Sequence, residues 1–180
     1  MNVFALDNDP VIAAQMHCDK HVVKMIIEYA QLMSTAHRVL DGALYLDKTA
    51  NNRNIRRWQL ARHDDVIYKA SHINHPSNIW ARKTSGNYQY LHTMWIALCN
   101  EYTLRYNKKH LTQIKLENIL CLEPTNIPDG EMTELPQAMP DDAKLLNVVD
   151  AYRNYYNKHK SSFAKWTNRP TPSWFEGESV

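Results

Sequence analysis

"HCDKHVVKMIIEYAQLMSTAH", residues 17–37, decides the fold, because it predicts a long helix with an unusual surface. Four polar side chains, spaced four, three and four residues apart, fall within one narrow sector at roughly 100° per residue. They are His17, His21, Lys24 and Glu28. Apolar residues occupy most of the remaining circumference. The pattern therefore predicts a largely apolar helix that carries one polar stripe, the name used below for these four residues.

Start and stop signals place the other elements. Asp9 and Pro10 predict a helix start, the helical pattern runs to about Leu40 with a break near His17, and Gly42 is a plausible stop. The expected elements that follow are a loop over 43–56 and helices over about 56–70, 78–107, 111–122 and 142–160. Residues 123–142 contain four prolines and predict an acidic, irregular surface loop, and residues 168–180 predict an extended C-terminal tail.

Helical spacing also predicts which side chains face the core. In the two long later helices these are Tyr88, Leu91, Trp95, Leu98 and Tyr102, then Leu145, Val148, Val149, Tyr152 and Tyr156. No segment shows the alternation typical of a strand. The expected fold is all-α: one compact helical domain over residues 1–180 with long irregular loops.

Length and composition restrict the class of protein. With 180 residues and 44% hydrophobic residues, the chain can bury a single core. We expect no membrane association, because no segment resembles a membrane span or a secretory signal. Cys18, Cys99 and Cys121 are scattered and form no CxxC spacing, which favours a reducing cytoplasm over a disulfide framework.

The net charge of +2 is unevenly distributed. Residues 53–83 carry seven Arg and Lys against two acids, and residues 143–180 are again basic, whereas residues 117–142 carry seven acids and no Arg or Lys. Two basic segments are compatible with a face that binds a polyanion, and equally with ordinary solvated helix surfaces.

The polar stripe allows three interpretations from the residues alone. It forms a structural hydrogen-bond chain, in which Lys24 and Glu28 are an i,i+4 pair. Alternatively, His17 and His21 bind zinc together with His72 and His75 of the "HINHP" segment. In the third interpretation Glu28, partly desolvated among apolar neighbours and close to an amine, exchanges protons during imine chemistry.

A family resemblance favours the third interpretation. The run "DKHVVKMIIEYAQL" resembles the first catalytic helix of the pyrimidine-dimer DNA glycosylase (endonuclease V-like) superfamily, which has Asp-x-His followed seven residues later by the catalytic Glu. Asp19, His21 and Glu28 stand at those positions. "HINHPSNIW" with the helix after it is similar to the family's His-Pro segment, and "RPTPSWF" is similar to its aromatic tail.

The resemblance implies a catalytic group of three residues: Glu28 as the central acid/base, flanked by His21 and Lys24. Family members attack the sugar C1′ with the α-amine that is exposed after Met1 is removed. Here Asn2 is bulky enough for Met1 to be retained. The amine is therefore that of Met1, Lys24 or Lys20, or the lyase step is absent.

DNA binding requires cations for the phosphates and stacking surfaces for an extruded base. The candidates for DNA contact are His17, Lys20, His72, His75, Arg82, Lys83 and Trp174. Arg82 and Lys83 fall in the first turn of the helix expected over 78–107, where they oppose its dipole and suggest an anionic ligand. Neither a cofactor nor a metal ion is expected.

The sequence thus predicts a DNA-processing enzyme of glycosylase type, with a possible AP-lyase step, acting on a damaged or modified pyrimidine in duplex DNA. The alternatives are a non-catalytic module that binds nucleic acid or protein, and a histidine-metal enzyme.

Overall fold

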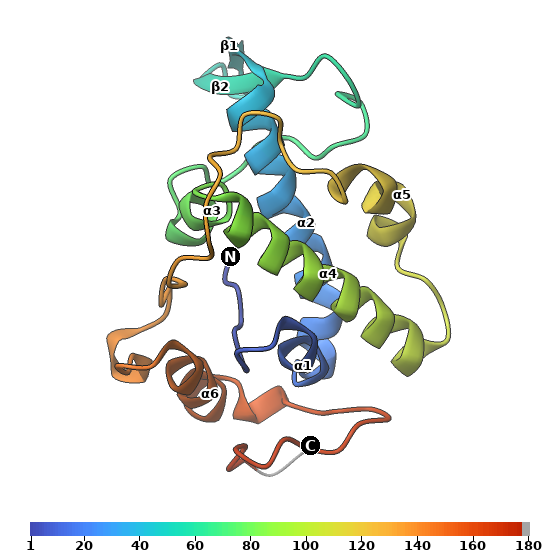
Figure 1. Ribbon diagram of the computed structural model, residues 1–180, viewed down its shortest axis with the longest axis vertical. Coiled ribbons are helices and arrows are strands. Elements are labelled where there is room, and N and C mark those ends of the chain that lie inside the picture. The colour runs from blue at the N-terminus through green and yellow to red at the C-terminus, as the bar shows by residue number, and fades with distance from the viewer. Residues whose placement is uncertain (178–180) are drawn as a thin grey trace.

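The computed structural model describes residues 1–177 and is mostly helical, with one small sheet (Figure 1). Its elements are α1 (Pro10–Gln15), α2 (Asp19–Asp41), β1 (Ala43–Lys48), β2 (Asn54–Gln59), α3 (Pro76–Ala81), α4 (Ser85–Tyr106), α5 (Leu111–Leu120) and α6 (Val148–His159). Short 3-10 turns occupy Asp141–Ala143 and Ser161–Phe163. Among the described residues, no helix has the length and apolar composition that a bilayer span requires.

The first two helices follow their sequence signals. Asp9 caps α1 by accepting a hydrogen bond from the backbone N–H of Val11 at 2.8 Å, and Pro10 occupies the first helical position. The predicted break near His17 is confirmed, since α1 ends at Gln15 and α2 begins at Asp19.

Helices α2 and α4 cross at the centre of the molecule, and the shorter elements cover them (Figure 1). The indole N–H of Trp95 in α4 donates to the carbonyl of Ile26 in α2 at 2.9 Å, which ties the two helices together where they cross. Four of the five predicted core residues of α4 are buried, and Tyr102 is half-buried. The N-terminal segment, residues 1–6, also enters the core, with Val3–Leu6 buried.

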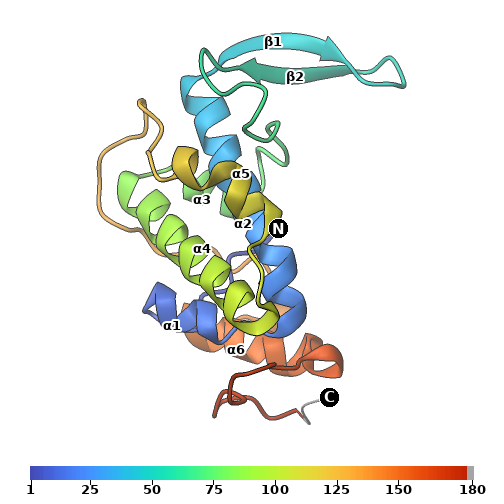
Figure 2. The ribbon, with the colours of Figure 1, turned by 90° about the vertical axis from the view of Figure 1, so that its right-hand side faces the viewer.

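The strictly all-α prediction is wrong between residues 43 and 70. The segments expected as a loop (43–56) and as a helix (56–70) contain β1 and β2, which pair antiparallel with Leu44 opposite Trp58 and Leu46 opposite Arg56. We call residues 43–59 the hairpin. It extends from the C-terminal end of α2, away from the helical body (Figure 2). Leu44, Tyr45 and Leu46 are all exposed, so the usual pattern of one buried and one exposed face is missing from the sequence of β1.

Two later helices also differ from expectation. The helix expected over 78–107 is interrupted at residues 82–84, where the Thr84 hydroxyl caps α4 by accepting a hydrogen bond from the Asn87 N–H. The last helix begins at Val148 rather than near residue 142. Leu145 precedes it and is 47% exposed, so its predicted core position is wrong, whereas Val149, Tyr152 and Tyr156 are buried.

The acidic loop, residues 123–142, is irregular as predicted and is fastened to the helices by hydrogen bonds. The Asp41 carboxylate at the end of α2 accepts from the N–H groups of Thr125 and Asn126 at 2.8 and 2.9 Å. Farther along, the Gly86 N–H donates to the Gly130 carbonyl. The described part of the predicted tail, residues 168–177, forms neither helix nor strand, and its last three residues lie outside the described residues.

The junction between α2 and the hairpin gives a prediction about stability. A Cβ atom on Gly42 would lie 2.5 Å from the Arg38 carbonyl oxygen and 2.9 Å from the Trp58 Cβ. Gly42→Ala should therefore force the hairpin away from α2 and lower the free energy of unfolding by about 1–3 kcal/mol. Gly130→Ala is the matched control, since its Cβ would meet the Thr84 side chain at 3.2 Å or more. Urea unfolding measures both, and equal values would contradict the prediction.

Candidate functional site

The Glu28 carboxylate lies next to two amino groups. Its Oε2 is 3.8 Å from the backbone nitrogen of Met1, and its Oε1 is 3.3 Å from Lys24 Nζ. Lys24 and Glu28 stand one turn apart on α2, and Met1 is brought there by the N-terminal segment. The Glu28 side chain is 16% exposed and the Lys24 side chain 67%. These three groups form the amine–carboxylate site.

Contacts of the N-terminal segment fix the position of Met1. The Phe4 N–H donates to the hydroxyl of buried Tyr29 in α2 at 3.0 Å. The Phe4 ring stacks on His21, with ring centroids 4.4 Å apart. Tyr29 holds the N-terminal segment through Phe4, and Glu28, the preceding residue of α2, faces the Met1 amine.

Helix α3 and the loop before it border the site. His75 caps α3 by accepting the Ser77 N–H at 3.2 Å. Burial lowers the pKa of His75, the nearby charges of the Met1 ammonium and His72 lower it further, and Glu28 opposes them. His75 therefore lies within electrostatic reach of the Met1 ammonium and Glu28. His72 is exposed.

Asn78 adds a polar group on the Met1 side of the site. Its amide nitrogen donates to the Ser71 carbonyl at 2.8 Å and lies 3.9 Å from Met1 Sδ. Its Oδ1 is buried and has no hydrogen-bond partner among the described residues. A buried acceptor without a partner is costly and uncommon.

His17 belongs to the core rather than to a cleft. It is fully buried, its Nδ1 contacts the Ala13 carbonyl at 2.7 Å, and its Nε2 contacts the Tyr29 hydroxyl at 2.8 Å. The Ala13 carbonyl can only accept, so Nδ1 donates to it, and in the neutral ring Nε2 accepts the Tyr29 hydroxyl proton. Burial lowers the pKa of His17 to about 4, and the charge of Arg105 contributes to the decrease.

His21 is buried as well. Its Nδ1 forms a short hydrogen bond with the hydroxyl of Tyr156 in α6, and burial is the main reason that its pKa falls to about 2. The four residues of the polar stripe therefore do not share one site, because α6 and the N-terminal segment cover His17, expected as a DNA contact, and His21, expected as a catalytic residue. The stripe divides into a buried structural half and a half that forms the amine–carboxylate site.

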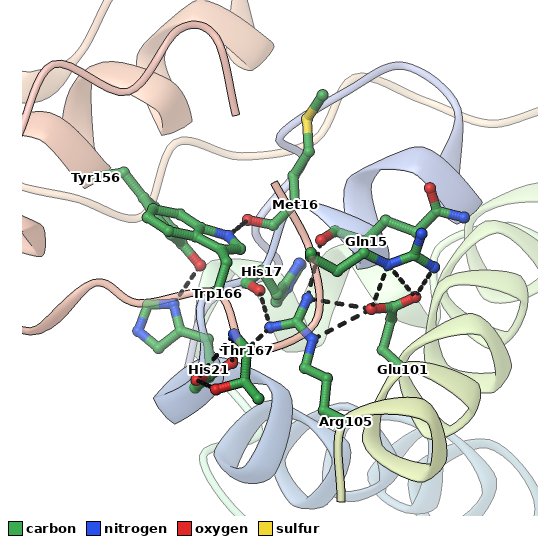
Figure 3. A network of polar contacts seen from close by, with 11 residues as sticks. Gln15, Met16, His17, His21, Glu101, Arg105, Tyr156, Trp166 and Thr167 are labelled. Atoms are coloured by element: carbon green, nitrogen blue, oxygen red, sulfur yellow. Dashed lines mark hydrogen bonds and ion pairs between the residues drawn. The ribbon is translucent and has the colours of Figure 1, made fainter. Parts of the chain in front are cut away.

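A second polar cluster surrounds Arg105, as Figure 3 shows. The fully buried guanidinium donates to the carbonyls of His17 and Gln15 at 2.8 and 3.0 Å, and to the carboxylates of Asp19 and Glu101 at 2.9 and 3.1 Å. This cluster was not predicted. Its signal in the sequence is an i,i+4 charged pair, Glu101 and Arg105, in a helix that carries no other Asp, Glu, Lys or Arg.

The C-terminal segment closes this cluster. Asp19 accepts hydrogen bonds from the backbone N–H and the hydroxyl of Thr167, the latter at 2.7 Å. The Trp166 indole donates to the Met16 carbonyl at 2.8 Å, and Arg169 pairs with Glu101 (Figure 3). Asp19, matched to the family Asp by resemblance, therefore contacts structural groups here.

The other predicted DNA contacts are dispersed. Lys20 is exposed on α2, with Nζ 4.7 Å from the centroid of the Phe163 ring. Arg82 is half-buried and donates to the Ile73 carbonyl at 2.7 Å, while Lys83 is exposed. Both lie between α3 and α4, so their predicted place in the first turn of a long helix is wrong. Trp174 packs edge-on against Tyr156.

The zinc interpretation is wrong for the described residues, among which no three His, Cys, Asp or Glu side chains are grouped as metal ligands. Two surface hollows lie away from the amine–carboxylate site. One of about 570 Å³ lies between α1 and α4, and one of about 460 Å³ lies at the C-terminal end of α2; neither is lined by Met1 or Glu28.

No protein-family model matches the chain, and comparisons with curated proteins and with solved structures give no significant match. The resemblance of α2 to a glycosylase helix therefore rests on its short motifs.

The two buried histidines predict acid sensitivity. In the unfolded chain they bind protons near pH 6.5, but in the folded protein not until pH falls to about 4 and about 2. Stability should be complete above pH 6.5 and decrease as pH falls below it, by about 2 kcal/mol per histidine at pH 5.

Urea unfolding at pH 7.5 and pH 5.0 measures this loss. His17→Gln should be less stable at pH 7.5 but should show a smaller decrease at pH 5.0. His63→Asn is the control: His63 is exposed with a φ of 59°, a conformation that Asn tolerates, so it should keep the full pH dependence. Equal unfolding free energies for the parent protein at the two pH values would contradict the assignment.

Proposed function

We propose that the protein is a DNA-processing enzyme of glycosylase type that acts on a damaged or modified pyrimidine through an imine intermediate. The observation that carries the proposal is the position of the Glu28 carboxylate between two amines, 3.8 Å from the Met1 nitrogen and 3.3 Å from Lys24 Nζ. An amine attacks a sugar carbon in its uncharged form, so it needs a proton acceptor within reach.

In the proposed reaction the amine attacks C1′ of the sugar. The bond between C1′ and the pyrimidine nitrogen breaks, and the base leaves with the bonding electron pair and takes a proton from solvent. Glu28 accepts the proton that the attacking nitrogen loses. It returns this proton to O4′ when the sugar ring opens, and a protonated imine joins C1′ to the protein.

The surroundings favour the Met1 amine over Lys24. Met1 is held by the Phe4–Tyr29 hydrogen bond and by the buried segment behind it, whereas the Lys24 side chain is 67% exposed. A fixed nucleophile has less orientational freedom to lose on reaching the reacting carbon.

Charge and compartment are consistent with this proposal. Lys20 and Lys24 are exposed on the α2 surface that leads to Glu28, where they suit the phosphates of DNA. We further propose a cytoplasmic location, in keeping with the free thiols of Cys18, Cys99 and Cys121.

An abasic-site duplex tests the imine step without knowledge of the target base, because its sugar exposes an aldehyde at C1′. With sodium borohydride present, the parent protein should form a covalent adduct, and peptide mapping should place the adduct on Met1. An adduct on Lys24 would support the imine step but would identify Lys24, rather than Met1, as the nucleophile. Absence of any adduct would refute the proposal and favour a non-catalytic binding module. The structural hydrogen bonds of His17 and His21 are consistent with that alternative.

Glu28→Gln tests the carboxylate. Glutamine keeps the volume but cannot exchange a proton, so adduct formation should slow by about 10²-fold or more while DNA affinity stays close to that of the parent. Glu123→Gln is the control, since this half-buried carboxylate contacts Gln89 and not the residues of the amine–carboxylate site, and it should not affect the rate.

A melting curve of each variant accompanies the rate measurement. If Glu28→Gln lowered stability by about 1–3 kcal/mol and left the rate unchanged, Glu28 would be a structural partner of Met1 and Lys24 rather than a proton carrier.

A further inference from the structure

The hairpin presents an unpaired face of mixed apolar and basic character. Cross-strand partners share a face of an antiparallel pair, so one face carries Leu44 with Trp58, Leu46 with Arg56, and Lys48 with Asn54. Leu44 is 58% exposed and Leu46 72%, and no other element covers them among the described residues. Exposed leucines on a projecting sheet indicate a contact surface rather than part of the core.

The charge of the hairpin is positive. It carries four cations, Lys48, Arg53, Arg56 and Arg57, and one carboxylate, Asp47. Arg57 Nε lies 3.6 Å from the Asp47 carboxylate, so the only acid is already paired, and Lys48, Arg53 and Arg56 remain exposed. In Figure 2 the hairpin extends to one side of the C-terminal end of α2, and the acidic loop lies on the other.

The base of the hairpin is held firmly on α2. Arg38, 4% exposed, donates from Nη1 to the Trp58 carbonyl at 2.7 Å and to the Asp64 carboxylate at 2.7 Å. Its other nitrogens bind the carbonyls of Tyr68, Asp64 and Ile67 at 2.6–2.8 Å. Gly42 lets the second strand approach the end of the helix closely. The direction of the hairpin is thereby fixed relative to α2, the helix that carries Glu28.

We propose that the hairpin is a DNA-gripping arm that binds the backbone of the duplex flanking the base handled at Glu28. A two-stranded ribbon fits a groove of B-DNA, its cations match the phosphates, and its leucines suit the apolar sugar edges of the groove. A second copy of this chain fits less well, because a two-fold contact between hairpins would bring the exposed cations of both copies together. The inference rests on the proposed function, which supplies the target base.

The length of α2 sets the reach of this arm. Thirteen residues separate Glu28 from Asp41, which at 1.5 Å per residue is about 20 Å along the helix. The proposal places the duplex along α2, and DNA rises about 3.4 Å per base pair, so the hairpin would contact the duplex about six or more base pairs from the target base.

Salt-dependent binding tests the arm. The probe is a fluorescent 25-base-pair duplex with a central tetrahydrofuran abasic analogue, titrated by anisotropy between 50 and 300 mM NaCl. Lys48→Gln/Arg53→Gln/Arg56→Gln should reduce the slope of log affinity against log salt by about 2–3 and weaken binding at least tenfold. Arg53→Gln alone, in the turn of the hairpin, should reduce the slope by about 1 and guards against misfolding of the triple variant.

The matched control removes three exposed cations from another part of the surface, by Lys108→Gln/Lys109→Gln/Lys115→Gln. It should leave the slope near that of the parent protein. An equal reduction in the control, or none in the hairpin variants, would overturn the proposal. So would a dimer in sedimentation that the hairpin substitutions dissociate, because the face would then be a self-interface.

Shortened duplexes test the reach. With three base pairs left on one side of the abasic analogue, first on the 5′ side and then on the 3′ side, one truncation should bring the parent to the affinity of the triple variant. If the difference survives both truncations, the proposed reach is wrong. Hairpin-dependent binding without a borohydride adduct would support the arm and refute the glycosylase chemistry, so the two proposals fail separately.

Discussion

The hydrogen bond from the Phe4 N–H to the Tyr29 hydroxyl is the contact on which the rest of the arrangement depends. Both groups lie inside the core, where an unpaired polar group is costly. The chain of bonds continues from the Tyr29 hydroxyl to His17 Nε2, and from His17 Nδ1 to the Ala13 carbonyl. These bonds join the N-terminal segment, α1 and α2, and leave each of these buried groups with a partner.

Helix α2 transmits this constraint to both ends of the molecule. The position of Tyr29 sets the direction of the Glu28 side chain, because adjacent helical residues point about 100° apart. Tyr29 points into the core, and Glu28 points to its edge. Farther along the same rigid rod, Arg38 sets the hairpin and the following loop. The acidic loop is tied to the end of this helix through Asp41. One helix therefore relates the amine–carboxylate site to both the basic and the acidic surface.

Sequence signals with a local physical cause were sufficient to predict much of this fold. The Asp9–Pro10 cap, the stop at Gly42 and the prolines of the acidic loop act on their immediate neighbours, and each has its expected effect. The hairpin was missed because its leucines are exposed, so the sequence lacks the alternation that burial imposes on a strand. Arg105 was missed because its partners Gln15, His17 and Asp19 are distant in sequence, and no local pattern reports such a cluster.

The polar stripe shows why spacing alone could not define the site. His21 and Glu28 are seven residues apart and point in nearly the same direction from α2. Their environments differ because different elements cover them: Phe4 and Tyr156 enclose His21, whereas Met1 meets Glu28 at the start of the same N-terminal segment. A sequence pattern reports the direction of a side chain but not what lies over it. The N-terminal segment covers the histidines and also carries the Met1 amine to Glu28. The structural interpretation therefore describes the His17 and His21 half of the polar stripe, and the proposed imine chemistry describes the Lys24 and Glu28 half.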